Sequence, residues 1–419
     1  MKMKLLFGLA IATGLSATIS AQQIHDTVTV GASYVNEVYY NLQSGNKNSI
    51  VRSDWDLAFA ADGVGFGASV IRVNDGMGAE LYLFSNDTAD WSTLDTTGFN
   101  WAANRLINAD TTWTEGAFNN FTPSSGFDLG WGEYSTITHI VSGSRIFVLK
   151  LHNGQYKKII IDRLQSGIYH FRYADVNGNN EVSTTLTKSN HSGQNFGYYS
   201  IQNQQELSRE PGTSTWDLLF TKYVTDLGGG MLYGVTGVLA NINVKVAQVN
   251  NVPDVNTVSH TGQNYTFDIG TIGYDWKSFN MTTFQYDIED SLVYFVETAN
   301  QDIYKIIFTG FGGNSNGEYA FTKEYITNVN INELAEQKTI LNVYPNPAKD
   351  NINITYNGLD NQTYLYVYDL TGKQVLTQVW NNGVGLNQEQ IDVSQLQQGV
   401  YFLSLVSGNK TSTQKIIIQ

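Results

Sequence analysis

The side chains that could bind a metal or act as nucleophiles are few and scattered. The chain has six histidines, five methionines and no cysteine. Without cysteine there can be no disulfide, thiolate metal site, cysteine nucleophile or lipoprotein anchor. The spacing of His139, His152, His170 and His191 matches no metal-binding pattern. Spacing alone therefore indicates no metal centre.

Three short motifs resemble known sites but are better explained as turns. Residues 313–317 read Gly-Asn-Ser-Asn-Gly, which formally fits a nucleophile elbow. That motif requires a helix after it, whereas here we expect a second strand and hence a hairpin turn. The glycines of residues 63–67 open no helix, which excludes a phosphate-binding loop. Residues 175–181 alternate acidic and amide side chains, where turn chemistry is a better explanation than calcium binding.

The composition excludes some partners and indicates export. The 419 residues carry a formal net charge of −14, so the basic footprint that a nucleic-acid partner requires is missing. Lys2 and Lys4 precede an apolar run over residues 5–15, and small residues end the segment at Ala21. We interpret residues 1–21 as a secretory signal peptide. We expect no transmembrane segment, because no other apolar run is long enough to span a membrane.

Five short motifs occur twice in the same order, which predicts an internal duplication. The pairs are Tyr39-Tyr40-x-Leu42 and Tyr198-Tyr199-x-Ile201, Trp55-Asp56-Leu57-Ala58-Phe59 and Trp216-Asp217-Leu218-Leu219-Phe220, Trp131-x-x-Tyr134 and Trp276-x-x-Phe279, Tyr156-Lys157-Lys158-Ile159 and Tyr304-Lys305-Ile306-Ile307, and Gly167-x-Tyr169-x-Phe171 and Gly317-x-Tyr319-x-Phe321. We predict two copies of one module, residues 22–184 and 185–333. The first copy has a longer segment around Trp91, Trp101 and Trp113, which we expect to be a loop.

The chain is predicted to be all-β, with two tandem antiparallel modules and a small C-terminal immunoglobulin-like sandwich. Residues 145–151 and 156–161 are apolar, β-branched runs separated by His152-Asn153-Gly154, which is typical of a hairpin. Residues 292–298 and 304–308 repeat this arrangement. No window keeps a helical period, and we expect at most a short helix near residues 101–106 or 331–336.

Residues 334–419 are predicted to form a linker and a separate unit. We expect strands at residues 351–356, 363–369, 399–406 and 414–419, and a turn at residues 370–372. This unit resembles the type A C-terminal sorting domain of type IX secretion cargo. The residues that carry the resemblance are Tyr344, Pro345, Asn346, Pro347, Gly372, Gly399 and Lys415. The resemblance implies that the type IX secretion machinery is a partner, that the chain passes through the periplasm to the cell surface or medium, and that this unit is then removed.

Residues 35–325 resemble the HmuY-like haemophore family. The resemblance rests on the duplicated motifs and on Ile71-Arg72-Val73-Asn74-Asp75-Gly76, and it says more about the sheet than about the ligand. It implies a haem cofactor held by two His or Met side chains, one of them five residues after the second tryptophan. That position is Met281 in the second copy and Thr136, which cannot ligate usefully, in the first. For the other ligand the second copy offers Met231 or His260, and we expect His260.

The leading hypothesis is therefore a non-enzymatic, exported binding protein that captures haem or a porphyrin through its second module. A competing interpretation makes Met281 a core gap-filler and His260 a solvated turn residue. An adhesin or glycan-binding protein that reuses the fold is the alternative function, favoured by the tryptophan-rich loop of the first copy. A hydrolase has no supporting motif.

Overall fold

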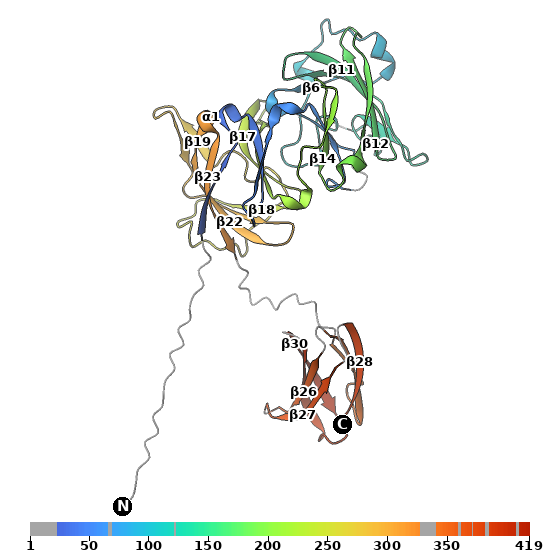
Figure 1. Ribbon diagram of the computed structural model, residues 1–419, viewed down its shortest axis with the longest axis vertical. Coiled ribbons are helices and arrows are strands. Elements are labelled where there is room, and N and C mark those ends of the chain that lie inside the picture. The colour runs from blue at the N-terminus through green and yellow to red at the C-terminus, as the bar shows by residue number, and fades with distance from the viewer. Residues whose placement is uncertain are drawn as a thin grey trace, which may run out of the picture. The chain divides into compact units, whose positions relative to one another are not determined.

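The computed structural model describes residues 23–65, 69–120, 123–326, 341–358, 362–370, 372–381, 385–407 and 410–419. The predicted signal peptide and the helix considered near residues 331–336 lie outside them. The chain divides into two compact units, Met1–Thr327 and Asn328–Gln419 (Figure 1). The described residues are almost wholly antiparallel β-structure, which confirms the predicted fold class.

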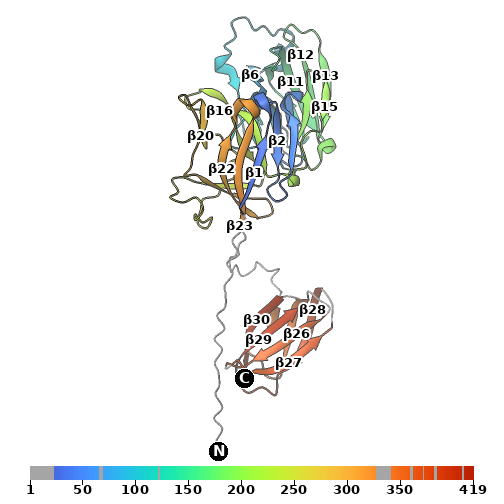
Figure 2. The same cartoon turned by 60° about the vertical axis from the view of Figure 1, so that its left-hand side comes forward.

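The first unit contains two larger sheets. The five-stranded sheet has the order β1 (Gln23–Thr29), β23 (Glu318–Ile326), β22 (Ile303–Phe311), β21 (Val293–Glu297) and β18 (Lys245–Val249). The eight-stranded sheet runs β13 (Val182–Thr187), β12 (Ile168–Asp175), β11 (Tyr156–Gln165), β10 (Ile146–Lys150), β6 (Glu80–Ser85) and β7 (Arg105–Leu106), with β8 (Gly132–Tyr134) and β9 (Val141–Gly143) beside β11. Figure 2 shows β1 and β22 on one side of this unit and β11, β12 and β13 on the other.

Two four-stranded sheets and a hairpin complete the unit. The sheets are β15 (Gln205–Leu207), β14 (Phe196–Ser200), β4 (Leu57–Ala60) and β5 (Ile71–Val73), and β17 (Leu232–Ala240), β16 (Leu218–Asp226), β2 (Asn36–Tyr40) and β3 (Lys47–Val51). The hairpin is β19 (Lys277–Asn280) with β20 (Gln285–Ile288). Between β22 and β23, the expected hairpin turn contains a single helical turn, α1 (Gly313–Asn316).

The two predicted copies, residues 22–184 and 185–333, are called the first and second halves of this unit. Both four-stranded sheets combine strands from the two halves. In one, β2 pairs with β16, so that Tyr40 lies opposite Leu218. In the other, β14 pairs with β4, so that Tyr199 lies opposite Leu57. Each Tyr-Tyr strand thus lies beside the Trp-Asp strand of the other half. The pairing of β1 with β23 adds a further N-terminal strand to the sheet of the second half.

The first unit contains two aromatic cores, and the repeated residues take equivalent places in them. Trp131 lies against Tyr169, with 6.3 Å between ring centroids. Trp276 lies against Tyr319 at 5.9 Å. All four rings are fully buried. Because large aromatic side chains bury much apolar area, these four residues contribute strongly to the stability of both cores.

The second unit is a small sandwich around its own apolar core. Its sheets are β24 (Leu341–Tyr344), β25 (Asn351–Gly358) and β28 (Gly385–Asp392), and β27 (Gln374–Trp380), β26 (Thr363–Tyr368), β29 (Gly399–Ser407) and β30 (Lys410–Ile418). Asn346 joins the entry of this unit to its last strand: its side chain donates to the Lys415 carbonyl at 3.0 Å and accepts from the Ile417 N–H at 2.9 Å.

Candidate functional site

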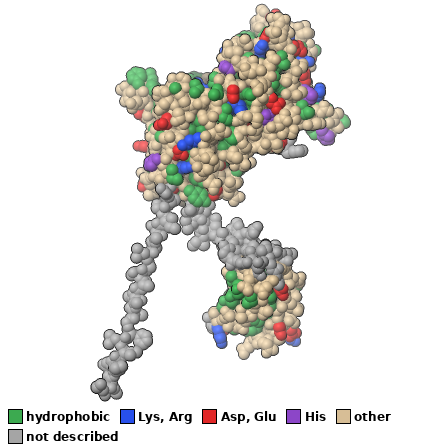
Figure 3. All heavy atoms as spheres, viewed as in Figure 1, with side chains coloured by type: hydrophobic (Ala, Val, Ile, Leu, Met, Phe, Trp, Pro, Cys, Tyr) green, Lys and Arg blue, Asp and Glu red, His purple; other side chains and the backbone are tan. Residues whose placement is uncertain are grey.

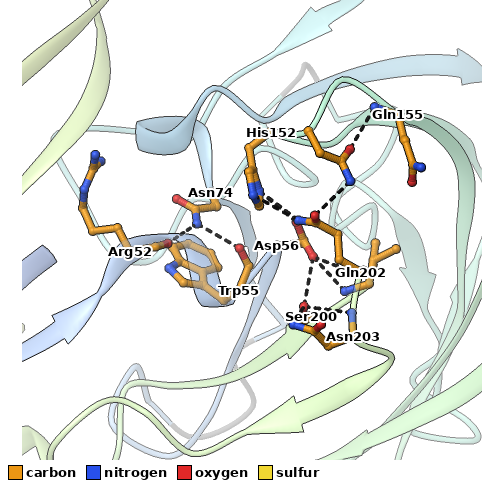
Figure 4. Close-up of polar contacts among 11 residues, drawn as sticks. Arg52, Trp55, Asp56, Asn74, His152, Gln155, Ser200, Gln202 and Asn203 are labelled. Atoms are coloured by element: carbon orange, nitrogen blue, oxygen red, sulfur yellow. Dashed lines mark hydrogen bonds and ion pairs between the residues drawn. The ribbon is translucent and has the colours of Figure 1, made fainter. Parts of the chain in front are cut away.

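A cluster of polar side chains surrounds Asp56 of the first Trp-Asp motif (Figure 4). The buried carboxylate accepts hydrogen bonds from the Ile201 N–H at 2.8 Å and the Gln202 side chain at 3.2 Å. His152 Nδ1 lies 3.7 Å from it, and the Ser200 hydroxyl donates to it at 3.5 Å. In a hydrolase triad the imidazole stands between the hydroxyl and the carboxylate. Here the hydroxyl faces the carboxylate directly, so the cluster is structural.

The second Trp-Asp motif makes the same contacts. Asp217 accepts the Leu42 N–H at 2.7 Å. Asn241 donates to the Trp216 carbonyl at 2.8 Å, as Asn74 donates to the Trp55 carbonyl at 2.9 Å. Buried backbone N–H groups need such acceptors. Each Trp-Asp motif therefore helps to hold the Tyr-Tyr strand of the other half in place.

A small, partly open cavity lies where the two halves meet. Its volume is about 50 Å³, and its lining includes Trp55, Trp216, Tyr39, Tyr198 and Glu210. Tyr198 Oη donates to Glu210 at 2.9 Å, and burial raises the pKa of Glu210 to about 8. Pockets that enclose organic ligands typically reach about 300 Å³ or more. This cavity suits a few water molecules and is too small for a porphyrin.

Met281 lies at the exposed tip of the β19–β20 hairpin. The Met281 side chain is 74% exposed, and Phe284 beside it is 73% exposed. The hairpin is held against β22 through Tyr286, which packs edge-on against Phe311 with 4.8 Å between ring centroids. In Figure 3, hydrophobic side chains cover the projecting end where Figure 1 places β19. Met281 is therefore not a core gap-filler.

His260 lies elsewhere, in the loop after β18. Its ring faces Phe295 of β21 at 6.2 Å. Phe295 belongs to a small cluster on one face of the five-stranded sheet, whereas its neighbour Tyr294 belongs to the main core on the other face. The hairpin that carries Met281 packs through Phe311 on that main-core face. The structure therefore does not bring His260 and Met281 together, and Met231 lies on the separate β16–β17 turn.

The β8–β9 hairpin is the first-half counterpart of this tip. The His139 N–H donates to the Ser135 carbonyl at 2.8 Å, as the Phe284 N–H donates to the Asn280 carbonyl at 2.8 Å. His139 and Phe284 also share the unusual φ of 56°. His139 thus occupies the place of Phe284, beside Ile137, which is 89% exposed. The family position five residues after Trp131 is Thr136, so that count does not identify His139.

Tyr134 holds the His139 ring in place. The Tyr134 Oη and His139 Nδ1 atoms are 2.7 Å apart. When Nδ1 carries the proton it donates to this oxygen, and the Nε2 lone pair is then the one that can bind a metal. An imidazole and a thioether both suit haem iron. Each hairpin tip thus exposes one side chain that could coordinate iron, Met281 or His139.

The described ranges contain no group of three or more His, Asp or Glu side chains that could hold a bare metal ion. They also contain no helix long and apolar enough to cross a membrane. The two tips lie on opposite sides of the first unit, since β9 pairs with β11 and Figures 1 and 2 place β11 away from the β19–β20 hairpin.

Two family models match the chain. The model described as HmuY protein matches residues 33–173, and the model described as secretion system C-terminal sorting domain matches residues 342–419. A comparison with curated proteins gave no match. The sorting domain indicates export through the type IX route. The chain is thus a protein of the cell surface or the medium that carries an HmuY domain and a C-terminal sorting domain.

Proposed function

We propose that this chain is an exported binding protein that captures haem or a related porphyrin at the tips of the β8–β9 and β19–β20 hairpins. The observation that carries the proposal is the exposed apolar tip around Met281, where a thioether stands beside Phe279 and Phe284. The match to the HmuY model, a family associated with haem, supports the ligand class.

The exposed apolar side chains of the β19–β20 hairpin tip support this proposal. Large apolar side chains gathered on an exposed hairpin mark an interaction site, because water contact with them is unfavourable. A porphyrin offers a flat apolar face that such a tip can cover, and its iron accepts a thioether or an imidazole. In this proposal Met281 and His139 each supply one protein ligand. The second repeat then acts as a variant of the HmuY module in residues 185–333.

The test is a titration of the mature full-length protein with haemin, in ferric and ferrous forms, followed by the Soret absorbance. Met281→Ala should remove the bound-haem signal of one site, and His139→Ala that of the other. The double variant should retain neither. Near-ultraviolet circular dichroism checks that each variant keeps its aromatic cores.

Matched controls use side chains of the same type elsewhere. Met231→Ala changes another exposed methionine, and His170→Ala changes another histidine of the first half. Both should bind haemin as the wild type does. A Soret signal that survives the double variant, or that depends on Met231, would contradict the proposed ligands. Absence of any haemin binding by the wild type would contradict the function.

A further inference from the structure

The surface is hollowed at one end of the eight-stranded sheet, away from the hairpin tips. Three loops form an open groove there: residues 94–96, the β10–β11 turn at Gln155 and Tyr156, and the β12–β13 turn at residues 175–177. Its volume is about 570 Å³. Loops gathered at one end of a rigid sheet are common positions for ligand sites.

The floor of the groove is aromatic. Tyr156 lines it and is 39% exposed. Behind Tyr156 stands Trp101, with 5.2 Å between the ring centroids. Trp101 in turn meets Tyr82 at 4.9 Å and Phe99 at 4.8 Å, both edge-on. This row of rings fixes the position of Tyr156, so its ring is a preformed surface for a ligand.

The rim of the groove is polar. Asp95 accepts hydrogen bonds from the Thr97 N–H at 2.9 Å and the Thr97 hydroxyl at 2.7 Å, which lower its pKa. Asp175 accepts from Lys157 and Asn180, and these bonds lower its pKa as well. Both carboxylates are therefore acceptors at neutral pH. Gln155 and Asn177 add amide groups at the same rim.

The loop that contains residues 94–96 is held against the sheet by contacts of Trp91. Trp91 Nε1 donates to Glu181 at 3.0 Å. Lys158 Nζ donates to the Trp91 carbonyl at 2.6 Å and lies 4.5 Å from the centroid of its ring. Cation–π contacts and hydrogen bonds of this kind hold a long loop in one conformation. The groove therefore exists before any ligand arrives.

We propose that this groove binds a neutral polysaccharide, with one sugar ring stacked on Tyr156 and sugar hydroxyls donating to Asp95 and Asp175. The apolar C–H face of a sugar fits an exposed aromatic ring, and its hydroxyls are donors that match carboxylate acceptors. The Asp95 carboxylate repels anionic ligands. A basic peptide is disfavoured because Lys157 already neutralises Asp175.

The test is native affinity electrophoresis of the mature full-length protein in gels that contain laminarin, xylan, galactomannan or mannan. At least one of these polymers should retard the protein. Tyr156→Ala should weaken that retardation about tenfold or more, in the range of a central aromatic contact. Tyr156→Phe should retain it, because the ring remains. Asp95→Asn should weaken it more modestly.

Tyr233→Ala is the matched control, since Tyr233 is an exposed tyrosine of β17. It should migrate as the wild type does in every gel. Two results would overturn the proposal: no retardation by any polymer, or equal retardation of Tyr156→Ala and the wild type. Because the hairpin variants leave the groove untouched, failure of haem binding and failure of polysaccharide binding are separate outcomes.

Discussion

The carboxylate of Asp217 accepts a hydrogen bond from the backbone N–H of Leu42 at 2.7 Å, although 175 residues separate the two in the chain. Asp56 binds the Ile201 N–H in the same way at 2.8 Å. Each half thus completes its sheet with a strand from the other half. The core of the second half includes Val28, Val38 and Tyr40 from the N-terminal strands. The two halves are therefore expected to fold as one cooperative body.

Asp217→Ala should destabilise both halves together. The substitution leaves the buried Leu42 N–H without its acceptor, which costs about 1–3 kcal/mol. Hydrogen exchange measured by mass spectrometry should show faster exchange in β4 as well as in β16. Asp226→Ala, at the exposed end of β16, is the control and should change little. Faster exchange confined to the second half would argue against a single body.

Glu210 should make the stability of the first unit fall as pH rises. Burial raises its pKa to about 8 in the folded protein, against 4.5 for an ordinary glutamate. Between these values the folded state holds a proton that the unfolded state has lost. The free energy of unfolding then decreases by at most about 1.4 kcal/mol per pH unit and levels off above pH 8.

Glu210→Gln should remove this dependence. The variant should be more stable than the wild type at pH 9, whereas at pH 4 the wild-type carboxyl is protonated in both states and that advantage should disappear. Urea unfolding of both proteins at the two pH values measures the difference. A stability difference that is the same at pH 4 and pH 9 would show that Glu210 does not titrate as described.

Asp128→Asn should lower the stability of the first unit. Asp128 and Arg145 form a buried ion pair with 2.6 Å between Oδ2 and Nη2. Breaking such a pair leaves an uncompensated buried charge and costs about 3–5 kcal/mol. Asp162→Asn breaks a half-exposed pair with Arg172 and should cost less than about 1 kcal/mol. Equal midpoints in urea for the two variants would contradict this ranking.

Deleting residues 342–419 should stop export without unfolding the first unit. The sorting domain lies in a separate compact unit with its own core. We expect the truncated protein in the periplasm, with circular dichroism typical of β-structure. Cell fractionation and immunoblotting measure its location. Normal yield in the medium would show that this domain does not direct export.

The positions of the strands could be predicted, but the pairing of strands between the two halves could not. Strand and turn signals are local, so β10, β11, β21 and β22 appear where alternating apolar residues and Gly or Asn turns predict them. The question is whether Tyr40 lies opposite Leu57 of its own half or opposite Leu218 of the other half. Both Trp-Asp strands offer the same side chains in the same register, so the local pattern fits either pairing equally well.

The candidate sites were predictable only where one short segment carries them. Met281 could be singled out by its distance from Trp276, and its exposure follows from the hairpin tip. His139 was missed because the family position counted from Trp131 is Thr136, whereas His139 stands eight residues after Trp131, as Phe284 does after Trp276. The groove was missed because residues 94–96, 155–156 and 175–177 meet only through the sheet topology.

The pairing of β1 with β23 has a consequence for the order of events during synthesis and export. β1 is the first described strand to leave the ribosome, and β23 is the last strand of the unit, yet the two are hydrogen-bonded along their length. The five-stranded sheet therefore cannot close until residue 326 has emerged. A chain that cannot complete its fold until this point can still pass through a membrane channel in an unfolded state, which suits an exported protein.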